Sequence, residues 1–204
     1  MPTGNCSIEE FEARLQSRIA ESAADAPRNS GEIPQRSEIA LSNIKAEDLA
    51  IELGLWIPYS EVLKLGMPYP SGIENEVYFD ETSHTVIKIN NLITSQSISH
   101  LFRRLLMHNA IFPQTKYELV GFTGFGNRSV YPILRQDYVA NATYATHGEI
   151  LDYMEALGFT LCGDAEFSNG EIKIKDLRPR NVLKNTLGSI FVVDADFEVL
   201  TNND

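Results

Sequence analysis

The sequence predicts an α+β fold in which amphipathic helices alternate with short strands that pair as antiparallel hairpins. Two capping boxes, Ser7 with Glu10 and Thr146 with Glu149, each precede an apolar stripe with helical spacing. Runs rich in β-branched and aromatic residues occur in pairs separated by short polar connections, which is typical of hairpins. The 204 residues, 43% of them hydrophobic, suffice for one substantial core or two small lobes.

The composition argues against several classes of function. The formal net charge of −11 argues against a surface that collects nucleic acid or anionic lipid, because such surfaces need concentrated Lys and Arg. Cys6 and Cys162 stand in neither a metal-ligand nor a redox spacing, which indicates a reduced protein. The N-terminus lacks the features of a signal peptide, and no stretch approaches the roughly 18 apolar residues of a membrane span. We therefore expect a cytoplasmic protein with neither nucleic acid nor membrane among its partners.

The first 65 residues are predicted to form a helical extension. The helix after Ser7 is expected to pack through one apolar face, which comprises Ile8, Phe11, Leu15 and Ile19. Residues 21–36 are rich in Ala, Asp, Asn, Ser and Gly, with two Pro, and are expected to form a linker or a wrapping arm. Two short helices are expected at Lys45–Leu53 and Pro58–Leu65, the second with proline in its first turn.

The rest of the chain is predicted to alternate strands and helices. Between residues 66 and 139 we expect a hairpin of strands Glu76–Phe79 and Thr85–Ile89, a helix over about Ser97–Asn109, and strands near Tyr117–Thr123 and Val130–Tyr138. Between residues 140 and 204 we expect a helix after Thr146, with Ile150, Met154 and Leu157 buried and Gly158 at its end, then a type I′ turn at Asn169-Gly170 and a hairpin around Leu187-Gly188-Ser189.

Polar residues at strand ends carry the functional signal. The stretch IKIKDLRPRNVLKNTLGSIFVVDAD places Asp176, Asn181, Asp194 and Asp196 where they contribute nothing to a hydrophobic core. Carboxylate and amide oxygens are ligands that Mg²⁺ accepts, and phosphoryl transfer depends on neutralising phosphate charge and positioning the attacking oxygen. Each Asp taken singly is also an ordinary turn or cap residue, so the inference depends on the joint spacing.

These motifs and their order resemble the protein-kinase-like fold. DLRPRN matches the D-L-x-x-x-N part of the kinase catalytic loop, and FVVDAD stands where kinases carry a strand followed by D-F-G. VIKIN is similar to the strand motif V-A-I-K, and SGIENEVYF then corresponds to the loop that covers the phosphates. With LMHNAIFPQTKYELVGFTGF and ILDYMEALGF, the chain from Tyr69 to Val199 resembles more narrowly the kinase-like domains of polyvalent proteins of bacterial mobile elements, notably of Bacteroides-type bacteria. The first 65 residues lie outside this similarity.

The resemblance implies a minimal protein-kinase-like fold, with an antiparallel-sheet N-lobe, one interlobe helix and a much reduced C-lobe. The helical extension then comprises residues 1–65, the N-lobe and hinge residues 66–139, and the C-lobe with its catalytic-loop-like and metal-binding-loop-like hairpins residues 140–204. Only ten residues follow Asp194, so we expect neither an activation segment nor a helical platform for a peptide substrate.

The resemblance also implies a site for ATP and Mg²⁺. Asp176 is expected to orient or deprotonate the acceptor hydroxyl, and Arg178 to steady the transferred phosphate. The expected nucleotide contacts are Lys88, Gly72, Val77 and Leu134, and the expected metal ligands are Asn181, Asp194 and Asp196. Asp196 is equally compatible with a solvated role. We expect Lys88, Asp176, Asn181 and Asp194 to converge on one cleft.

Several residues depart from the kinase pattern. Ile174 stands where the catalytic loop usually has His, and Asp194-Ala195-Asp196 replaces D-F-G. The segment 90–117 contains no Asp or Glu, so the helix after Lys88 cannot supply the usual carboxylate partner, for which Glu76 or Gln96 are the expected substitutes. The covering loop is poor in glycine, which restricts backbone approach to phosphates.

Three functions are compatible with these residues. They are an ATP/Mg²⁺-dependent kinase-like enzyme, a catalytically silent module that binds nucleotide or protein, and an interaction component of a mobile element that uses the fold as a scaffold. The expected partners are a nucleotide and a small-molecule or protein acceptor. The four histidines and the pair Arg103-Arg104 are expected to be ordinary structural or solvated residues.

Overall fold

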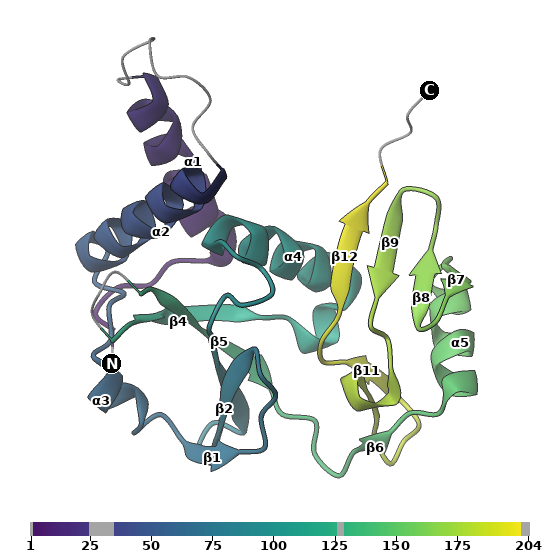
Figure 1. Cartoon of the computed structure of the whole chain (residues 1–204). Helices are drawn as coiled ribbons and strands as arrows, with labels where there is room; N and C mark the ends of the chain where they lie inside the picture. The colour runs from purple at the N-terminus through teal and green to yellow at the C-terminus, as the bar shows by residue number, and fades with distance from the viewer. Residues whose placement is uncertain (1, 25–34, 126–128, 201–204) are drawn as a thin grey trace. The chain divides into compact units, whose positions relative to one another are not determined.

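The computed structural model describes residues 2–24, 35–125 and 129–200 and divides into two compact units (Figure 1). Unit 1 is formed from Met1–Leu106 and Tyr117–Asp137, and unit 2 from Met107–Lys116 and Tyr138–Asp204. The division falls within one helix, whose last turn belongs to unit 2. Helices and antiparallel sheets occur in both units, which confirms the predicted α+β class.

Unit 1 is built on a five-stranded antiparallel sheet with the order β1-β2-β3-β5-β4. Its strands are β1 (Met67–Tyr69), β2 (Asn75–Asp80), β3 (Thr85–Asn90), β4 (Glu118–Thr123) and β5 (Tyr131–Asp137). Thr85, Ile87 and Ile89 of β3 are buried, and Val86 and Lys88 between them are half-buried. Since successive side chains on a strand point to opposite faces, Lys88 lies on the face opposite to Ile87 and Ile89.

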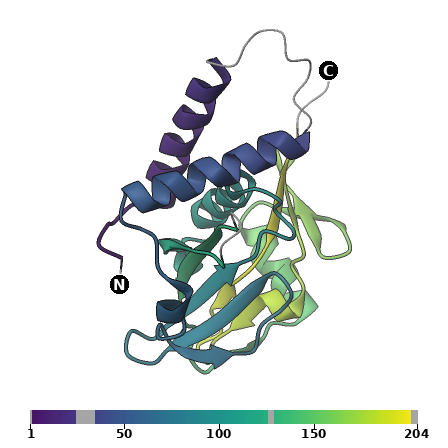
Figure 2. The same cartoon turned by 60° about the vertical axis from the view of Figure 1, so that its left-hand side comes forward.

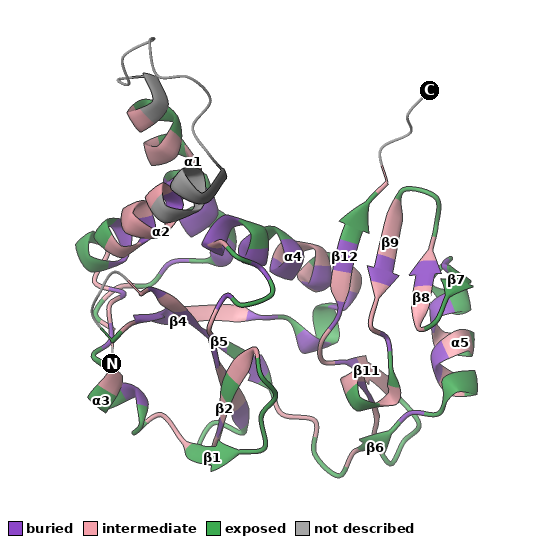
Figure 3. Ribbon diagram, in the orientation of Figure 1, coloured by how far each residue is buried: buried purple, intermediate pink, exposed green. Residues whose placement is uncertain are grey.

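Helices of unit 1 cover both faces of this sheet. They are α1 (Ile8–Ala24), α2 (Gln35–Glu52), the short α3 (Tyr59–Val62) and α4 (Ile98–Ile111). On the face of Lys88, one buried cluster joins residues of the three long helices to the sheet, among them Leu15, Leu49, Phe102, Phe122 and Leu134. On the opposite face, Ile57 and Val62 pack against Tyr78, Ile87, Ile89 and Ile133. Figure 3 shows buried positions, in purple, along α4 and on strands of the sheet.

The N-terminal helices follow the sequence prediction in part. Ser7 and Glu10 form the predicted capping box of α1, which packs against α2 as Figure 2 shows. α2 begins ten residues before the predicted start at Lys45, whereas α3 is shorter than predicted. The predicted linker over residues 21–36 was too long, because α1 extends to Ala24 and α2 starts at Gln35; residues 25–34 lie outside the described part of the chain.

In its described residues, unit 2 contains two small antiparallel sheets, one complete helix beside the last turn of α4, and two 3₁₀ turns. The first sheet, in the order β11-β10-β6, comprises β6 (Thr143–Tyr144), β10 (Val182–Lys184) and β11 (Ile190–Val192). The second, in the order β12-β9-β8-β7, comprises β7 (Thr160–Gly163), β8 (Glu166–Ser168), β9 (Ile172–Lys175) and β12 (Asp196–Val199). The helix is α5 (His147–Ala156), and the turns are η1 (Pro113–Thr115) and η2 (Pro179–Asn181). Their shared core includes Phe112, Met154, Ile174 and Val192.

Local signals in unit 2 are largely confirmed. The Thr146–Glu149 capping box starts α5, and Gly158 follows its end with a φ of 83° that suits glycine. Leu157 was predicted to be buried but is 42% exposed. The hairpin at Asn169-Gly170 forms, but only Gly170 has a positive φ, of 92°; a type I′ turn needs positive φ at both central residues, so that assignment was wrong.

Within the described ranges, no helix combines the length and the apolar character that crossing a bilayer requires.

Candidate active site

The catalytic-loop-like segment of unit 2 connects β9 to β10 and folds back on itself. Asp176 follows β9 directly with a φ of 58°, a left-handed conformation that Asp adopts more readily than most residues. After η2, the Asn181 side chain returns to Asp176: its Nδ2 donates to the main-chain oxygen and to Oδ2 of Asp176, both at 2.8 Å. The two ends of the D-L-x-x-x-N motif are therefore in direct contact.

This contact orients the amide of Asn181. Because Nδ2 bonds to Asp176, the amide oxygen is the atom left for another ligand, and no donor among the described residues reaches it. The main-chain oxygen of Asn181 accepts a hydrogen bond from the N–H of Val193 at 2.9 Å. Asp194 is the residue that follows Val193, so this bond brings its backbone close to Asn181. An amide oxygen and a nearby carboxylate are groups that can hold Mg²⁺, which takes few protein ligands.

The strand before Asp194 is anchored within unit 2. Thr115 Oγ1 donates to the main-chain oxygen of Val192 at 2.5 Å, two residues before Asp194. Asp194 itself is half-buried in the connection between β11 and β12. Within the described ranges, no three His, Cys, Asp or Glu side chains form a cluster suited to a metal ion. The predicted set has only two such residues because its third ligand is an amide.

Asp196, the third predicted metal ligand, begins β12. Its Oδ1 accepts the N–H of Phe197 at 2.9 Å, and its partner across the sheet is Lys175. The hydrogen bond from Lys175 to Glu198, at 2.6 Å, and the nearby charge of Asp196 raise the pKa of Lys175 above its ordinary value. Asp196 therefore lies beside a cation, and its role as a metal ligand stays a prediction.

Two arginines hold the Asp176 carboxylate. Arg180 Nη2 donates to both carboxylate oxygens, at 2.8 and 2.9 Å, and Arg178 Nε lies 3.2 Å from Oδ1. Arg178 also donates to Asp164 Oδ2 at 2.7 Å, which ties the loop to the β7–β8 turn. The sequence analysis did not single out Arg180, although its position four residues after Asp176 was a usable signal. The role of Arg178 in steadying the transferred phosphate stays a prediction.

In unit 1, three of the predicted nucleotide contacts form one row across the sheet. Lys88 on β3 is directly paired with Val77 on β2 and with Leu134 on β5. Directly opposed residues of neighbouring strands share a face, so the three side chains lie on the same side. Val77 and Lys88 are half-buried, whereas Leu134 is 1% exposed and belongs to the core. Their contact with a nucleotide stays a prediction.

The amine of Lys88 lies against Tyr117, which immediately precedes β4. Its Nζ donates to the phenol oxygen at 3.0 Å and lies 4.8 Å from the ring centroid. Glu76, one of the expected substitute partners, lies on the opposite face, where it accepts hydrogen bonds from Tyr59 and Tyr78. No sequence signal pointed to Tyr117, since it is 29 positions from Lys88 and looks like an ordinary core residue.

The loop that contains Gly72 is anchored by a buried ion pair. Glu74 Oε1 accepts from Arg104 Nη2 at 2.6 Å and from Asn90 Nδ2 at 3.1 Å. Burial alone raises the pKa of Glu74, but the charge and the hydrogen bond of Arg104 outweigh it, so the pKa lies below its usual value. Arg104 is only 8% exposed, so the expectation that the Arg103-Arg104 pair is solvated was wrong for Arg104. Gly72 is exposed, and a Cβ there would meet nothing within 4 Å.

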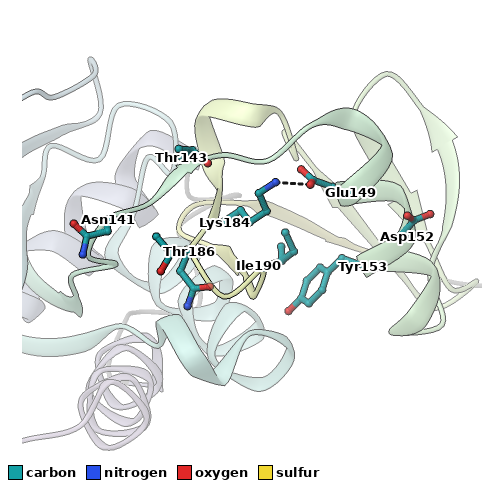
Figure 4. Close-up of a pocket in the computed structure, with 10 residues that line it drawn as sticks. Asn141, Thr143, Glu149, Asp152, Tyr153, Lys184, Thr186 and Ile190 are labelled. Carbon is teal, nitrogen blue, oxygen red and sulfur yellow. Dashed lines mark hydrogen bonds and ion pairs between the residues drawn. The ribbon is translucent and has the colours of Figure 1, made fainter.

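A separate cavity of about 660 Å³ in unit 2 contains none of the predicted site residues (Figure 4). Figure 4 shows Lys184 reaching Glu149, whose Oε1 accepts from Nζ at 2.5 Å. This bond, together with those from Thr146, lowers the pKa of Glu149 to about 2. The ion pair thus supports the capping box of α5.

A family model described as "Serine/Threonine/Tyrosine Kinase found in polyvalent proteins" matches residues 43–201, which is more than half of the chain. A comparison with curated proteins finds no match. The family match starts before Tyr69, so the expectation that all of the first 65 residues lie outside the similarity was wrong. The second half of α2 and all of α3 lie within the matched region.

Proposed function

Since the chain belongs to the family of serine/threonine/tyrosine kinases found in polyvalent proteins, we propose that it is an ATP- and Mg²⁺-dependent phosphotransferase acting on a small or self-presented acceptor. The setting of that family suggests in addition a role on a bacterial mobile element. The observation that carries the proposal is the closed contact between Asp176 and Asn181, supported by the family match.

The contact between Asp176 and Asn181 separates two tasks: the Asn181 amide holds the carboxylate of Asp176, and that carboxylate faces the acceptor. Asn181 Nδ2 fixes Asp176 from one side while the two arginines hold it from the other, so the carboxylate has one orientation toward an acceptor hydroxyl. Transfer of a phosphoryl group depends mainly on such positioning and on electrostatic stabilisation. Asp176 is 41% exposed at its side chain, which leaves room for an acceptor to reach it.

The residues of unit 2 fit a magnesium ion. Asn181 Oδ1 and the Asp194 carboxylate would hold it, and when bound it would neutralise charge on phosphate oxygens. In unit 1, Lys88 presents one amine beside the half-buried Val77, which suits a nucleotide that is charged at its phosphates and apolar at its base, whereas Leu134 belongs to the core below them.

A cavity beside the catalytic-loop-like segment suits part of a small acceptor. It measures about 300 Å³, lies within unit 2 and is lined in part by Leu151, Leu161, Asp164, Phe167 and Leu177. Leu177 adjoins Asp176 in the chain, and its N–H donates to Ala165 at 3.1 Å. An acceptor with an apolar group is therefore part of the proposal.

Two measurements test the proposal in sequence. A thermal-shift titration with ATP and Mg²⁺ comes first, because a ligand that binds only the folded state raises its stability, by about 2.7 kcal/mol at one hundred times Kd. We expect a shift with the wild-type chain that is reduced in Lys88→Met and in Asn181→Leu. No shift at millimolar ATP would contradict nucleotide binding.

Label transfer from radiolabelled ATP then tests catalysis. We expect autophosphorylation or transfer to an added acceptor pool to fall about a hundredfold or more in Asp176→Asn, which keeps the shape and the bond to Asn181. Asp152→Asn is the matched control, because this exposed carboxylate of unit 2 lies on α5, outside both the acceptor cavity and the catalytic-loop-like segment. Transfer that survives in Asp176→Asn would remove Asp176 from its proposed role.

The alternative proposal is a catalytically silent module that binds nucleotide or protein. The specific observation in its favour is that Asp176 is held by two guanidinium groups and an amide at once, so an acceptor hydroxyl must compete for it. Under this alternative, ATP and Mg²⁺ shift the melting temperature while neither the wild-type chain nor Asp176→Asn transfers label.

A further inference from the structure

A third and smaller cavity lies on the face of the unit 1 sheet opposite to Lys88. It measures about 150 Å³ and lies beside the β1–β2 loop, and its lining includes Ile73, Glu76, Ile89, Phe125 and Tyr131. Glu76 precedes Val77 on β2, and Ile89 follows Lys88 on β3. Because successive side chains of a strand alternate between faces, Glu76 and Ile89 point to the face opposite to that of Val77 and Lys88. This cavity is therefore separate from the row of predicted nucleotide contacts.

Aromatic rings form two walls of the cavity. The rings of Phe125 and Tyr131 have centroids 5.7 Å apart and planes at 63°, so they enclose an angle rather than stack. Tyr59 packs against Phe125, with a centroid distance of 4.2 Å. Phe125 is 60% exposed, so a large ring stays accessible to a ligand. The faces of such rings carry the negative part of their quadrupole.

A carboxylate completes the cavity. Glu76 Oε2 accepts hydrogen bonds from the hydroxyl groups of Tyr59, at 2.9 Å, and of Tyr78, at 3.2 Å. Burial, together with this carboxylate, raises the pKa of both tyrosines, which keeps them protonated as donors. No donor within the described ranges reaches Oε1, the second oxygen of Glu76. The bonds to Oε2 thus orient the Glu76 carboxylate, and Oε1 stays available for a ligand.

The geometry points to a binding site for an organic cation, in which a substituted ammonium or guanidinium group contacts Phe125 and Tyr131 and pairs with Glu76. Cations lie favourably over aromatic faces, and the pairing is strengthened where water is partly excluded. The volume is about half that of the smallest pockets that enclose a whole ligand, so it admits one cationic head group. The net charge of −11 favours the approach of cations.

Two sources can supply this head group: a free small amine and the arginine or methylated lysine side chain of a protein. The proposal does not rest on the proposed phosphotransferase activity, because it is argued from the cavity alone. Five lining residues belong to the segment that was predicted to cover the phosphates, namely Ser71, Gly72, Ile73, Asn75 and Glu76, but the predicted catalytic residues and the row of Val77, Lys88 and Leu134 lie outside the cavity. Failure of nucleotide binding and failure of cation binding are therefore distinguishable.

The test is an NMR titration of the ¹⁵N-labelled full chain with choline and with 3,3-dimethyl-1-butanol, its neutral isostere of the same shape. We expect choline to shift the amide signals of residues 71–76 and 131, and the neutral alcohol to bind more weakly. Glu76→Gln and Phe125→Leu should each raise the Kd for choline about threefold to thirtyfold. Glu76→Gln keeps an oxygen that accepts from both tyrosines, so its fold should be preserved, and its ¹⁵N spectrum checks this.

Asp80→Asn is the matched control, since Asp80 lies on the same strand and outside the cavity, and its Kd for choline should be unchanged. Equal affinity for choline and the alcohol, unchanged affinity in Glu76→Gln, or no shift at tens of millimolar choline would each overturn the assignment. Titration with N-acetyl-arginine amide and with an arginine-containing pentapeptide separates the sources. Tighter binding of the peptide supports a protein side chain, and equal binding supports a free small cation.

Discussion

The two units position their charged groups in different ways. In unit 1, Lys88 is held by strands and by Tyr117, which lies 29 positions away in the chain. In unit 2, Asp176 is held by Arg180 and Asn181, which are four and five positions away. Unit 1 therefore needs its whole sheet and helical cover to place one amine, whereas unit 2 places its carboxylate and amide within a single loop.

This difference has an energetic consequence. Arg104 and Glu74, which anchor the loop that contains Gly72 in unit 1, are largely buried. Removing one of them therefore takes the counter-charge from the other at a place where little water can replace it. Polar groups around Asp176 are partly exposed, and water can replace a lost contact. Stability and site geometry are thus coupled in unit 1 and separable in unit 2.

The largest expected effect is that of Arg104→Met in unit 1. The change leaves the largely buried Glu74 carboxylate without its counter-charge, with Asn90 as a remaining neutral donor, and we expect the free energy of unfolding to fall by about 3 kcal/mol. Urea denaturation followed by the fluorescence of Trp56, the single tryptophan, measures this in unit 1. The double variant Glu74→Gln with Arg104→Met should regain much of the lost free energy of unfolding, because no unpaired charge is left. A loss of less than about 1 kcal/mol in Arg104→Met alone would contradict the proposed difference between the two units.

A smaller effect is expected at the start of α5 in unit 2. Thr146→Ala removes the side-chain oxygen that accepts the Glu149 N–H and should cost about 1 kcal/mol of stability. Thr146→Ser keeps that oxygen and is the matched control. Hydrogen exchange of the α5 amides reports on this helix, and equal protection in both variants would show that the cap contributes nothing.

Arg180→Ala tests whether the site in unit 2 can be changed without unfolding. The ion pair with Asp176 is exposed, with 64% and 41% of the two side chains accessible, so its loss should cost about 0.2–1 kcal/mol. Arg135→Ala removes a comparably exposed pair with Glu118 in unit 1 and should cost a similar amount. Thermal unfolding compares the two; a much larger loss for Arg180→Ala would mean that unit 2 depends on its site for stability.

The smallest effect is expected at Glu12 on α1, and it depends on pH. Glu12 is 7% exposed, and burial, only partly opposed by the bond from Gln16, raises the pKa of Glu12 above its ordinary 4.5. The folded state therefore favours the protonated form, and wild-type stability falls as pH rises from 4.5 through the raised pKa. Glu12→Gln does not titrate and should be more stable than wild type at neutral pH by a few tenths of a kcal/mol.

That advantage should vanish as the pH is lowered toward 4.5, where the wild-type carboxyl is neutral as well. Glu9→Gln, on the exposed side of the same helix, is the control and should show no such trend. Melting temperatures of both variants across this pH range measure the difference. An advantage for Glu12→Gln that grows on acidification would reverse the sign and contradict the assignment.

The sequence by itself determined the features that depend on neighbouring residues. The capping boxes at Ser7 and Thr146, the hairpin strands around Lys88 and the turn at Gly170 all formed, because each is specified by side chains within a few positions. The contact between Asp176 and Asn181 belongs to the same class, since five positions separate the two residues. The family, too, was recognisable from these local motifs.

Only the tertiary structure decided which distant groups meet. Tyr117 rather than Glu76 contacts Lys88, and Arg104 is buried against Glu74 rather than solvated, because strand pairing and helix packing bring together residues about thirty positions apart. The cation-binding geometry of Glu76, Phe125 and Tyr131 likewise exists only once the sheet has formed. Side-chain spacing along a chain specifies a turn or a helix face, whereas the partner of a buried charge depends on how whole elements pack.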